Sequence, residues 1–214
     1  MFKDRTDVGK RLARKLKRYS GENAVVLALP RGGVVVGYEV AEALKLPLDI
    51  IAVRKVGHPF EPEYAIGAVD ENGFSLLNEE ETGLIDKALL QKEIAKERKE
   101  AKRRGIVYRK GGAPLSIGGK IVIVADDGIA TGLTMRLAVR AIKTHKPKEV
   151  IIAVPVAPFE AVRDLETEGI DKIVTLEPPG TFEGSVGAHY EDFDQVEDVE
   201  VVRLLQRDTH TATI

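Results

Sequence analysis

The chain has 214 residues, of which 43% are hydrophobic and 31% charged, and its net charge is −2. These values are typical of a globular domain with a sizeable core, and they provide no overall charge that would attract nucleic acid or an anionic membrane. The absence of cysteine excludes disulfides, thiolate metal sites and a cysteine nucleophile. No apolar stretch approaches the roughly 18–20 residues of a membrane span and no signal-peptide core is present, so we expect a cytoplasmic protein.

In chain order, the first half of the sequence predicts helices and strands separated by short loops. Val8, Leu12 and Leu16 recur at helical spacing with basic residues between them, which indicates an amphipathic helix. The apolar run 24–29 does not alternate with polar residues and ends at Pro30, as expected for a strand that is buried on both faces. The elements expected here are a helix over 6–19, a strand over 24–29, a helix over 34–46, a strand over 48–53, a loop over 56–62 and a hairpin of 65–69 with 74–77.

The second half continues the alternation of helices and apolar strands. A charged, helix-prone segment runs from Glu79 to about Arg104. It is followed by an expected strand over 121–125, helix over 131–143, strand over 149–157, helix over 159–168 and strand over 171–176. This alternation predicts an α/β fold with a mostly parallel sheet flanked by helices, whose ligands bind at the carboxyl ends of the strands. No repeat or linker divides the chain, so we expect a single domain over 1–214.

One motif stands out: residues 121–134 read IVIVADDGIATGLT. A loop that leads from a strand into a helix presents backbone N–H groups and the positive end of the helix dipole, which together favour a phosphate group. Asp126 and Asp127 would repel that phosphate, whereas carboxylates accept hydrogen bonds strongly from vicinal hydroxyls. The motif therefore predicts a site for a ribose that carries a phosphate. The alternatives are a helix-capping aspartate with a glycine-rich turn, or an acidic pair that binds a metal.

Together with three other blocks, this motif resembles the phosphoribosyl-pyrophosphate (PRPP) motif of the type I phosphoribosyltransferases. The other blocks are LALPRGGVVVGYEVAEAL, DIIAVRKVGHPFEPEYAIGAV and GAHYEDFDQVEDVEVVRLL. The resemblance covers most of the chain. It implies the type I phosphoribosyltransferase fold, with a core over about 20–176, a small C-terminal hood over about 177–205 and a helical insertion.

The resemblance also implies a role for each matching residue. Asp126 and Asp127 would bind the ribose hydroxyls and Mg²⁺. Gly128 is implied among the PRPP-binding residues, and the amides implied around the 5′-phosphate are those of Ala130, Thr131, Gly132, Leu133 and Thr134. The residues implied around the pyrophosphate are Arg31, Gly32, Gly33, Arg54 and Lys55. The residues expected to act in catalysis are Asp126, Asp127, Arg31 and Lys55. The cations, together with Mg²⁺, would neutralise the leaving pyrophosphate, and the reaction needs no covalent nucleophile.

Less is implied about the acceptor. Tyr190 and Phe193 of the expected hood would either stack on a planar base or anchor the hood to the core. The segment between Lys55 and Tyr64 is a candidate lid, to which His58 or Glu61 could contribute. Ala130 replaces the acid of the hypoxanthine–guanine enzymes, which puts those two bases in doubt. Two histidines, His145 and His189, lack the spacing of metal ligands, and we expect them at the surface.

Three functions are consistent with this donor site. The leading hypothesis is an Mg²⁺-dependent enzyme that transfers phosphoribose from PRPP to a nitrogenous, nucleobase-like acceptor. The second is a PRPP-sensing regulator that binds RNA or a protein, although the aromatic residue of the basic helix, Tyr19, falls on its apolar face. The third is a PRPP hydrolase with water as acceptor. We expect no nucleic-acid or membrane partner, and a homodimer.

Overall fold

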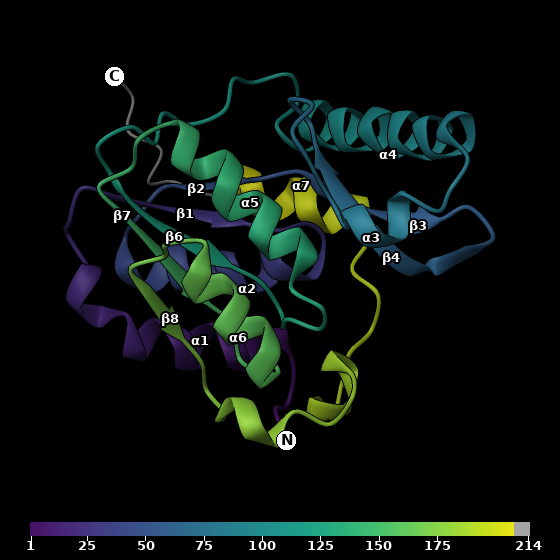
Figure 1. Ribbon diagram of the computed structural model, residues 1–214. Helices are drawn as coiled ribbons and strands as arrows, with labels where there is room; N and C mark the ends of the chain where they lie inside the picture. Colours follow the sequence, from purple (N-terminus) through teal and green to yellow (C-terminus); the bar gives the residue numbers. More distant parts are fainter. Residues whose placement is uncertain (208–214) are drawn as a thin grey trace.

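The computed structural model describes residues 1–207, so the last seven residues of the expected domain over 1–214 lie outside the described part of the chain. A parallel sheet in the order β2-β1-β6-β7-β8 forms its centre (Figure 1). The strands are β1 (Ala24–Ala28), β2 (Leu48–Ile50), β6 (Ile121–Ala125), β7 (Glu149–Ala153) and β8 (Lys172–Val174). The predicted α/β fold is confirmed.

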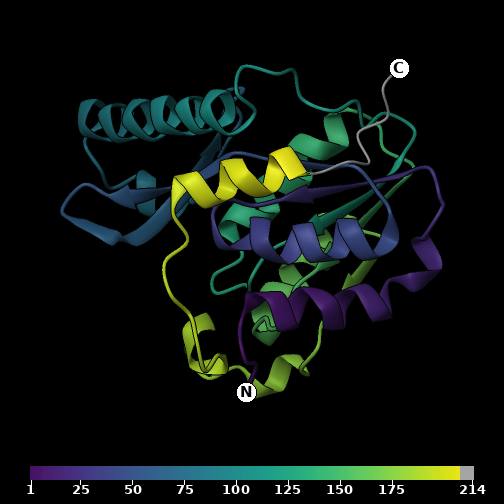
Figure 2. The same ribbon diagram turned by 180° about the vertical axis from the view of Figure 1, so that it is seen from behind.

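Helices cover both faces of this sheet. One face packs against α1 (Arg5–Lys15), α2 (Gly32–Leu44) and α7 (Asp198–Arg207), which lie in front in Figure 2. The other face packs against α5 (Leu133–Thr144) and α6 (Phe159–Thr167), which lie in front in Figure 1. Because successive strand residues point to opposite faces, Ile123 joins the first core and Val124 the second. Burial on both faces explains why these strands are apolar throughout.

A second, antiparallel sheet in the order β3-β4-β5 projects from the edge of the first. It consists of β3 (Val53–His58), β4 (Glu61–Asp70) and β5 (Ser75–Leu77), and it packs against α4 (Lys87–Tyr108), the predicted helical insertion, which is preceded by the short α3 (Glu79–Thr82) (Figure 1). The expected strand over 48–53 is confirmed only as β2 (Leu48–Ile50), and the expected loop over 56–62 was wrong. The expected hairpin of 65–69 with 74–77 is confirmed as the pair β4–β5. The chain leaves the first sheet after β2 and enters a hairpin whose irregular register around Gly57 hides the strand pattern.

The segment expected to form the hood, 177–205, consists of a loop followed by a helix. Residues 177–197 form a loop with short 3₁₀ turns, Pro179–Thr181 and Val186–His189, next to the N-terminus (Figures 1 and 2). From Asp198 onward the chain is α7, which sequence reasoning did not predict, and which packs against α2 and α4. Within residues 1–207, no helix is long and apolar enough to span a bilayer.

Candidate functional site

The central pairing of β1 with β6 brings together two loops that are far apart in the sequence. Ala28 and Ala125 are partners at the carboxyl ends of these strands, and the amide of Leu29 donates to the carbonyl of Ala125 at 3.0 Å. The chain then leaves β1 through Pro30 and β6 through Asp126. The two predicted ligand-binding loops are thus neighbours, as expected for a parallel α/β sheet.

The glycines after β1 lie directly against the aspartates after β6. A Cβ at Gly32 would come 1.9 Å from Oδ2 of Asp127, and a Cβ at Gly33 would come 2.7 Å from Oδ1 of Asp126. Any side chain at either position would collide with a carboxylate. The glycines therefore allow the strand-to-helix loop to approach the acidic pair.

The two aspartates have different surroundings. Oδ1 of Asp126 accepts a hydrogen bond from the amide of Asp127 at 2.9 Å. Burial raises the pKa of Asp126 well above its usual range, and the neighbouring charge of Asp127 raises it further. Asp127 instead has a cation beside it, because Nε of Arg5 donates to its Oδ2 at 2.7 Å.

Sequence reasoning missed Arg5, which belongs to the site through its contacts. Its Nη1 donates to the carbonyl of Asp194 at 2.7 Å, and its guanidinium lies 3.9 Å from the centroid of the Phe193 ring. As the first residue of α1, Arg5 is positioned by the Asp4 cap, which accepts from the amide of Asp7. No motif distinguishes it from the other basic residues of α1.

The helices that begin at this site, α2 and α5, have no side-chain cap, and the same is true of α6. By contrast, α1, α3 and α4 are capped by Asp4, Asn78 and Asp86. The cap position of α5 is Gly132, with φ of 78°, which favours glycine. The first amides of α5 therefore lack a partner within the helix and are available to an anion. Around them, Ala130 and Thr131 are exposed, while Leu133 and Thr134 are half-buried.

The predicted cations differ in their positions. Arg31 lies at the site, with Nη1 3.6 Å from Oδ1 of Asp198 and 3.8 Å from Oε2 of Glu197. Arg54 lies on β3 and donates to Glu97 of α4 at 2.9 Å. Strand alternation places Lys55 on the opposite face of β3, together with Val53, whose side chain belongs to the core beneath α5. Only one residue of the Arg54–Lys55 pair thus faces α5.

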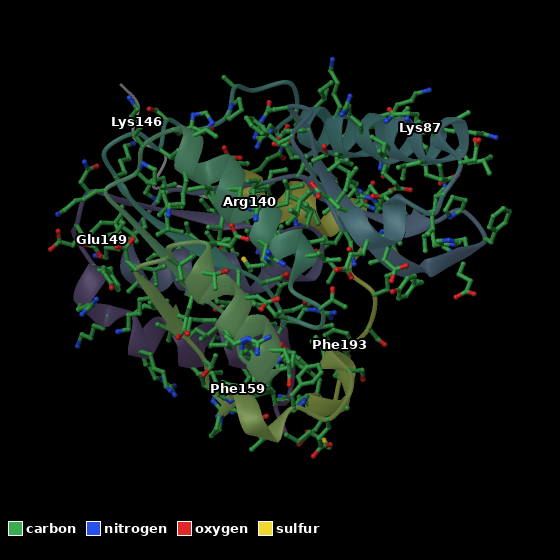
Figure 3. The ribbon with its side chains drawn as sticks, viewed as in Figure 1. Lys87, Arg140, Lys146, Glu149, Phe159 and Phe193 are labelled. Carbon is green, nitrogen blue, oxygen red and sulfur yellow. The ribbon has the colours of Figure 1, made fainter. Side chains whose placement is uncertain are left out.

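The hood covers the site with aromatic and aliphatic side chains. Tyr190 is buried, packs against Phe2 and Phe193, and donates from Oη to the carbonyl of Asp127 at 2.6 Å. Phe193, labelled in Figure 3 on the segment between hood and α7, remains 36% exposed. A Cβ at Gly128 would come 2.4 Å from Cγ1 of Val186, so the hood contacts the aspartate loop directly.

Two histidines and the candidate lid complete the comparison with the sequence. His189 was expected at the surface but is buried, where Nδ1 lies 2.7 Å from Glu177 and Nε2 accepts from the amide of Glu183. His145 is exposed, as expected. The segment proposed as a lid is the β3–β4 hairpin, with His58 next to Phe60, which is 77% exposed.

The donor set limits what metal the site could hold. Within the described residues, 1–207, no group of three or more histidine, aspartate or glutamate side chains is arranged to hold an ion. Asp126 and Asp127 supply two adjacent carboxylates. This set fits an Mg²⁺ ion that takes its remaining oxygen ligands from a substrate and from water.

Taken together, the fold and site define an α/β protein with a carboxylate pair and an uncapped helix start at the carboxyl edge of a parallel sheet. Residues 3–191 match the family model described as "Phosphoribosyl transferase domain". The chain therefore belongs to the phosphoribosyl transferase domain family, and the resemblance in its sequence is confirmed.

Similar proteins agree with this assignment. Two curated proteins, from two strains of Mycobacterium tuberculosis, carry the name "Putative phosphoribosyl transferase" and are 40% identical to the chain over 209 residues. The match covers 97% of this chain and 47% of theirs, so the chain spans about half the length of these relatives. The crystal structure of the protein TT1426 from Thermus thermophilus is 41% identical, with a TM-score of 0.78 over 95% of this chain and 97% of that one.

Proposed function

We propose that this chain transfers the 5-phosphoribosyl group of PRPP to a nitrogenous base and releases pyrophosphate in an Mg²⁺-dependent reaction. The observation that carries the proposal is the contact of Gly32 and Gly33 with Asp127 and Asp126. It joins a loop carrying a cation, a carboxylate pair and the uncapped start of α5 in one place. PRPP has a pyrophosphate, a diol and a phosphate to match these three features.

In this proposal each part of the donor has its own binding group. Asp126 and Asp127 accept hydrogen bonds from the ribose 2′ and 3′ hydroxyls. The backbone amides from Ala130 to Thr134 hold the 5′-phosphate at the start of α5. Arg31 and the backbone at Gly32 and Gly33 hold the pyrophosphate, with Lys55 and Arg54 as the further predicted cations.

The reaction breaks the bond between C1 of the ribose and the pyrophosphate oxygen, which leaves with the electron pair. The sugar becomes oxocarbenium-like, a nitrogen of the acceptor attacks C1, and the acceptor loses a proton. Arg31 stabilises the charge that develops on the leaving group. Val186, which covers Gly128, helps to exclude water from the donor.

The proposed Mg²⁺ would be held by Asp126 and Asp127 together with oxygens of PRPP. When bound, it supplies positive charge that neutralises the departing pyrophosphate. Because the chain offers two carboxylates at this point and no third acid joins them within residues 1–207, we propose that the ion arrives with the substrate.

The acceptor and the assembly remain predictions. Phe193 is the partly exposed ring next to the donor site, and so it is our candidate for contact with the acceptor base. Tyr190 supports Asp127 from a buried position, which favours an anchoring role over stacking. A homodimer, a cytoplasmic location and the lack of a nucleic-acid partner also stay predictions.

The test is to incubate the chain with PRPP and Mg²⁺, alone and with single nucleobases, and to measure pyrophosphate release. The control is the Asp126→Asn/Asp127→Asn double variant, shown to be folded by circular dichroism. Release that requires one base and disappears in the variant supports a transferase and identifies the acceptor. Release without a base would instead indicate a hydrolase. PRPP binding without release would indicate a sensor, and no PRPP binding would refute the proposal.

A further inference from the structure

The two charged groups that would receive PRPP already have partners within the chain. Asp127 Oδ2 accepts from Nε of Arg5 at 2.7 Å, so an N–H donor sits where the ribose hydroxyls would donate. Arg31 Nη1 lies 3.6 Å from Asp198 and 3.8 Å from Glu197, so carboxylate oxygens sit near the group that would hold pyrophosphate oxygens. Each internal partner has the chemical character of the substrate group expected at that position.

Both contacts involve one short segment, which we call the strap: residues 193–198, the end of the hood loop and the first residue of α7. The strap holds Arg5 on Asp127 and supplies Glu197 and Asp198 to Arg31. The carbonyl of Asp194 accepts from Nη1 of Arg5, and the ring of Phe193 lies under the same guanidinium. Glu197 and Asp198, at the other end of the strap, face Arg31. In Figures 1 and 2 this segment descends from α7 to the hood beside the N-terminus, and Figure 3 labels Phe193 on it.

The contact on Asp127 leaves little room for a second ligand. Gly32 and Arg5 both lie against Oδ2, and a Cβ at Gly32 would come 2.7 Å from Nε of Arg5 as well. The side chains of Arg5 and Asp127 are only 11% and 17% exposed. A ribose hydroxyl that donates to Oδ2 would therefore compete with the guanidinium of Arg5 for this oxygen.

The contact on Arg31 has a fixed part and a loose part. Asp198 is fixed by two residues of α4: its Oδ1 accepts from Oη of Tyr108 at 2.6 Å, and its Oδ2 lies 3.1 Å from Arg103. The side chain of Glu197 is 68% exposed. Pyrophosphate can thus displace Glu197 while Asp198 keeps the strap attached to α4.

We propose that Arg5 and Glu197 are internal counter-ligands of the PRPP site, and that PRPP binds by exchange with them. The ribose diol replaces Arg5 on Asp127, and the pyrophosphate replaces Glu197 on Arg31. This inference rests on the proposed function and adds a regulatory step to it. Donor binding loosens the strap. Breaking the internal pairs costs free energy, so PRPP binds more weakly than it would to a site without these pairs.

The test measures the two halves of the donor separately, with the full chain and isothermal titration calorimetry. Ribose 5-phosphate probes the Asp127 half, and inorganic pyrophosphate probes the Arg31 half. We expect Arg5→Met to bind ribose 5-phosphate several-fold more tightly and to leave pyrophosphate binding unchanged. We expect Glu197→Gln to bind pyrophosphate several-fold more tightly and to leave ribose 5-phosphate binding unchanged. Arg5→Lys, which keeps the charge, should bind both ligands with nearly the affinity of the unmodified chain.

The matched control is Arg11→Met, because Arg11 lies on the same helix, pairs with Asp7 and stacks over Phe2. It should change neither affinity. A merely structural role for Arg5 would weaken ribose 5-phosphate binding in Arg5→Met, which is the opposite of the expected change. Weaker or unchanged binding, or an equal gain for both ligands, would overturn the inference.

Failure of the inference can be distinguished from failure of the proposed function. If the unmodified chain binds PRPP but neither variant gains affinity for its ligand, only the exchange is refuted. If neither the unmodified chain nor the variants bind PRPP or its two halves, both proposals are refuted. Should Arg5→Met not fold, Glu197→Gln still tests the exposed half of the exchange.

Discussion

Gly32 and Asp127 are in direct contact, although one follows β1 and the other follows β6. A methyl group on Gly32 would lie 1.9 Å from Oδ2 and 2.7 Å from Cγ of the Asp127 side chain. This separation is far shorter than any van der Waals contact between such atoms. The absence of a side chain at one position thus determines where a carboxylate can lie at the other.

We expect Gly32→Ala to reduce PRPP affinity by at least about ten-fold, which corresponds to about 1.4 kcal/mol. The added methyl group forces the Asp127 side chain to rotate away from the position in which it would accept hydrogen bonds from the ribose diol. The fold should survive, because the atoms that must move belong to a side chain. Calorimetric titration with PRPP measures the affinity, and thermal unfolding checks the fold.

Gly180→Ala is the control for that substitution, since a Cβ at Gly180 would have no neighbour within 4 Å. It should change neither affinity nor stability. Unchanged PRPP binding in Gly32→Ala would show that the Asp127 carboxylate does not need its present position.

Unlike Gly32→Ala, the variant Gly33→Ala should destabilise the whole fold. A Cβ at Gly33 would come 2.9 Å from both the carbonyl oxygen of Ala125 and Cα of Asp126, which are backbone atoms and cannot rotate away. We expect a loss of about 1–3 kcal/mol in the free energy of unfolding, as for overpacked cores. Urea denaturation measures this value, and a loss no larger than that of Gly32→Ala would contradict the prediction.

Asp126 should titrate above the ordinary aspartate value of about 3.9. Burial raises its pKa, and the charge of Asp127 raises it further, while Arg5 lowers it. Removing the Arg5 charge in Arg5→Met should therefore move the midpoint to a higher pH. Carbon-13 NMR of the aspartate carboxyl groups follows the titration, with Asp126→Asn to assign the signal. A midpoint at or below the ordinary value would refute the prediction.

Arg109 should be important for stability, although it lies outside the site. It donates to Asp49 at 2.8 Å and to both oxygens of Glu71, and the side chains of Arg109 and Asp49 are 8% and 7% exposed. Arg109→Met leaves two partly buried carboxylates without their cation, which should cost about 3–5 kcal/mol. Urea denaturation provides the measurement.

The control for Arg109 is Arg163→Met, because Arg163 is 66% exposed and its pair with Asp164 is long, at 3.6 Å. Such a pair is worth less than about 1 kcal/mol. Similar losses for the two variants would mean that burial does not set the strength of the Arg109 network.

The central sheet was predictable because its strands are buried on both faces and so form continuous apolar runs. In the antiparallel sheet, the β4–β5 hairpin was predictable from its turn, which contains Asn72 and Gly73. Strand β3 was not, because its buried positions are Val53 and Val56, with Arg54 and Lys55 between them. A period of two is hard to recognise over so few residues and across a bulge. In α7 the buried residues Val201 and Leu204 have helical spacing. The resemblance nevertheless placed this segment in the expected hood over 177–205, and no helix was predicted there.

The two loops of the candidate site were predictable from local sequence, because each follows a buried strand, and the carboxyl ends of parallel strands meet at one edge of a sheet. Arg5 and the strap were not, because their role depends on contacts between distant parts of the chain. The Arg5–Asp127 pair spans 122 residues and the Arg5–Asp194 bond spans 189. Single-sequence patterns are local and carry no information about such pairs.

The N-terminal segment has a consequence for how the protein is made. Phe2 forms a bridge with Tyr190, and its amide donates to the carbonyl of His189 at 2.7 Å. Because most of the sheet lies between Phe2 and Tyr190 in the sequence, this contact can form only after the strands of the sheet have been translated. Since loop closure between distant residues comes late in folding, the sheet can assemble first, and the contact between the N-terminal segment and the hood forms after it.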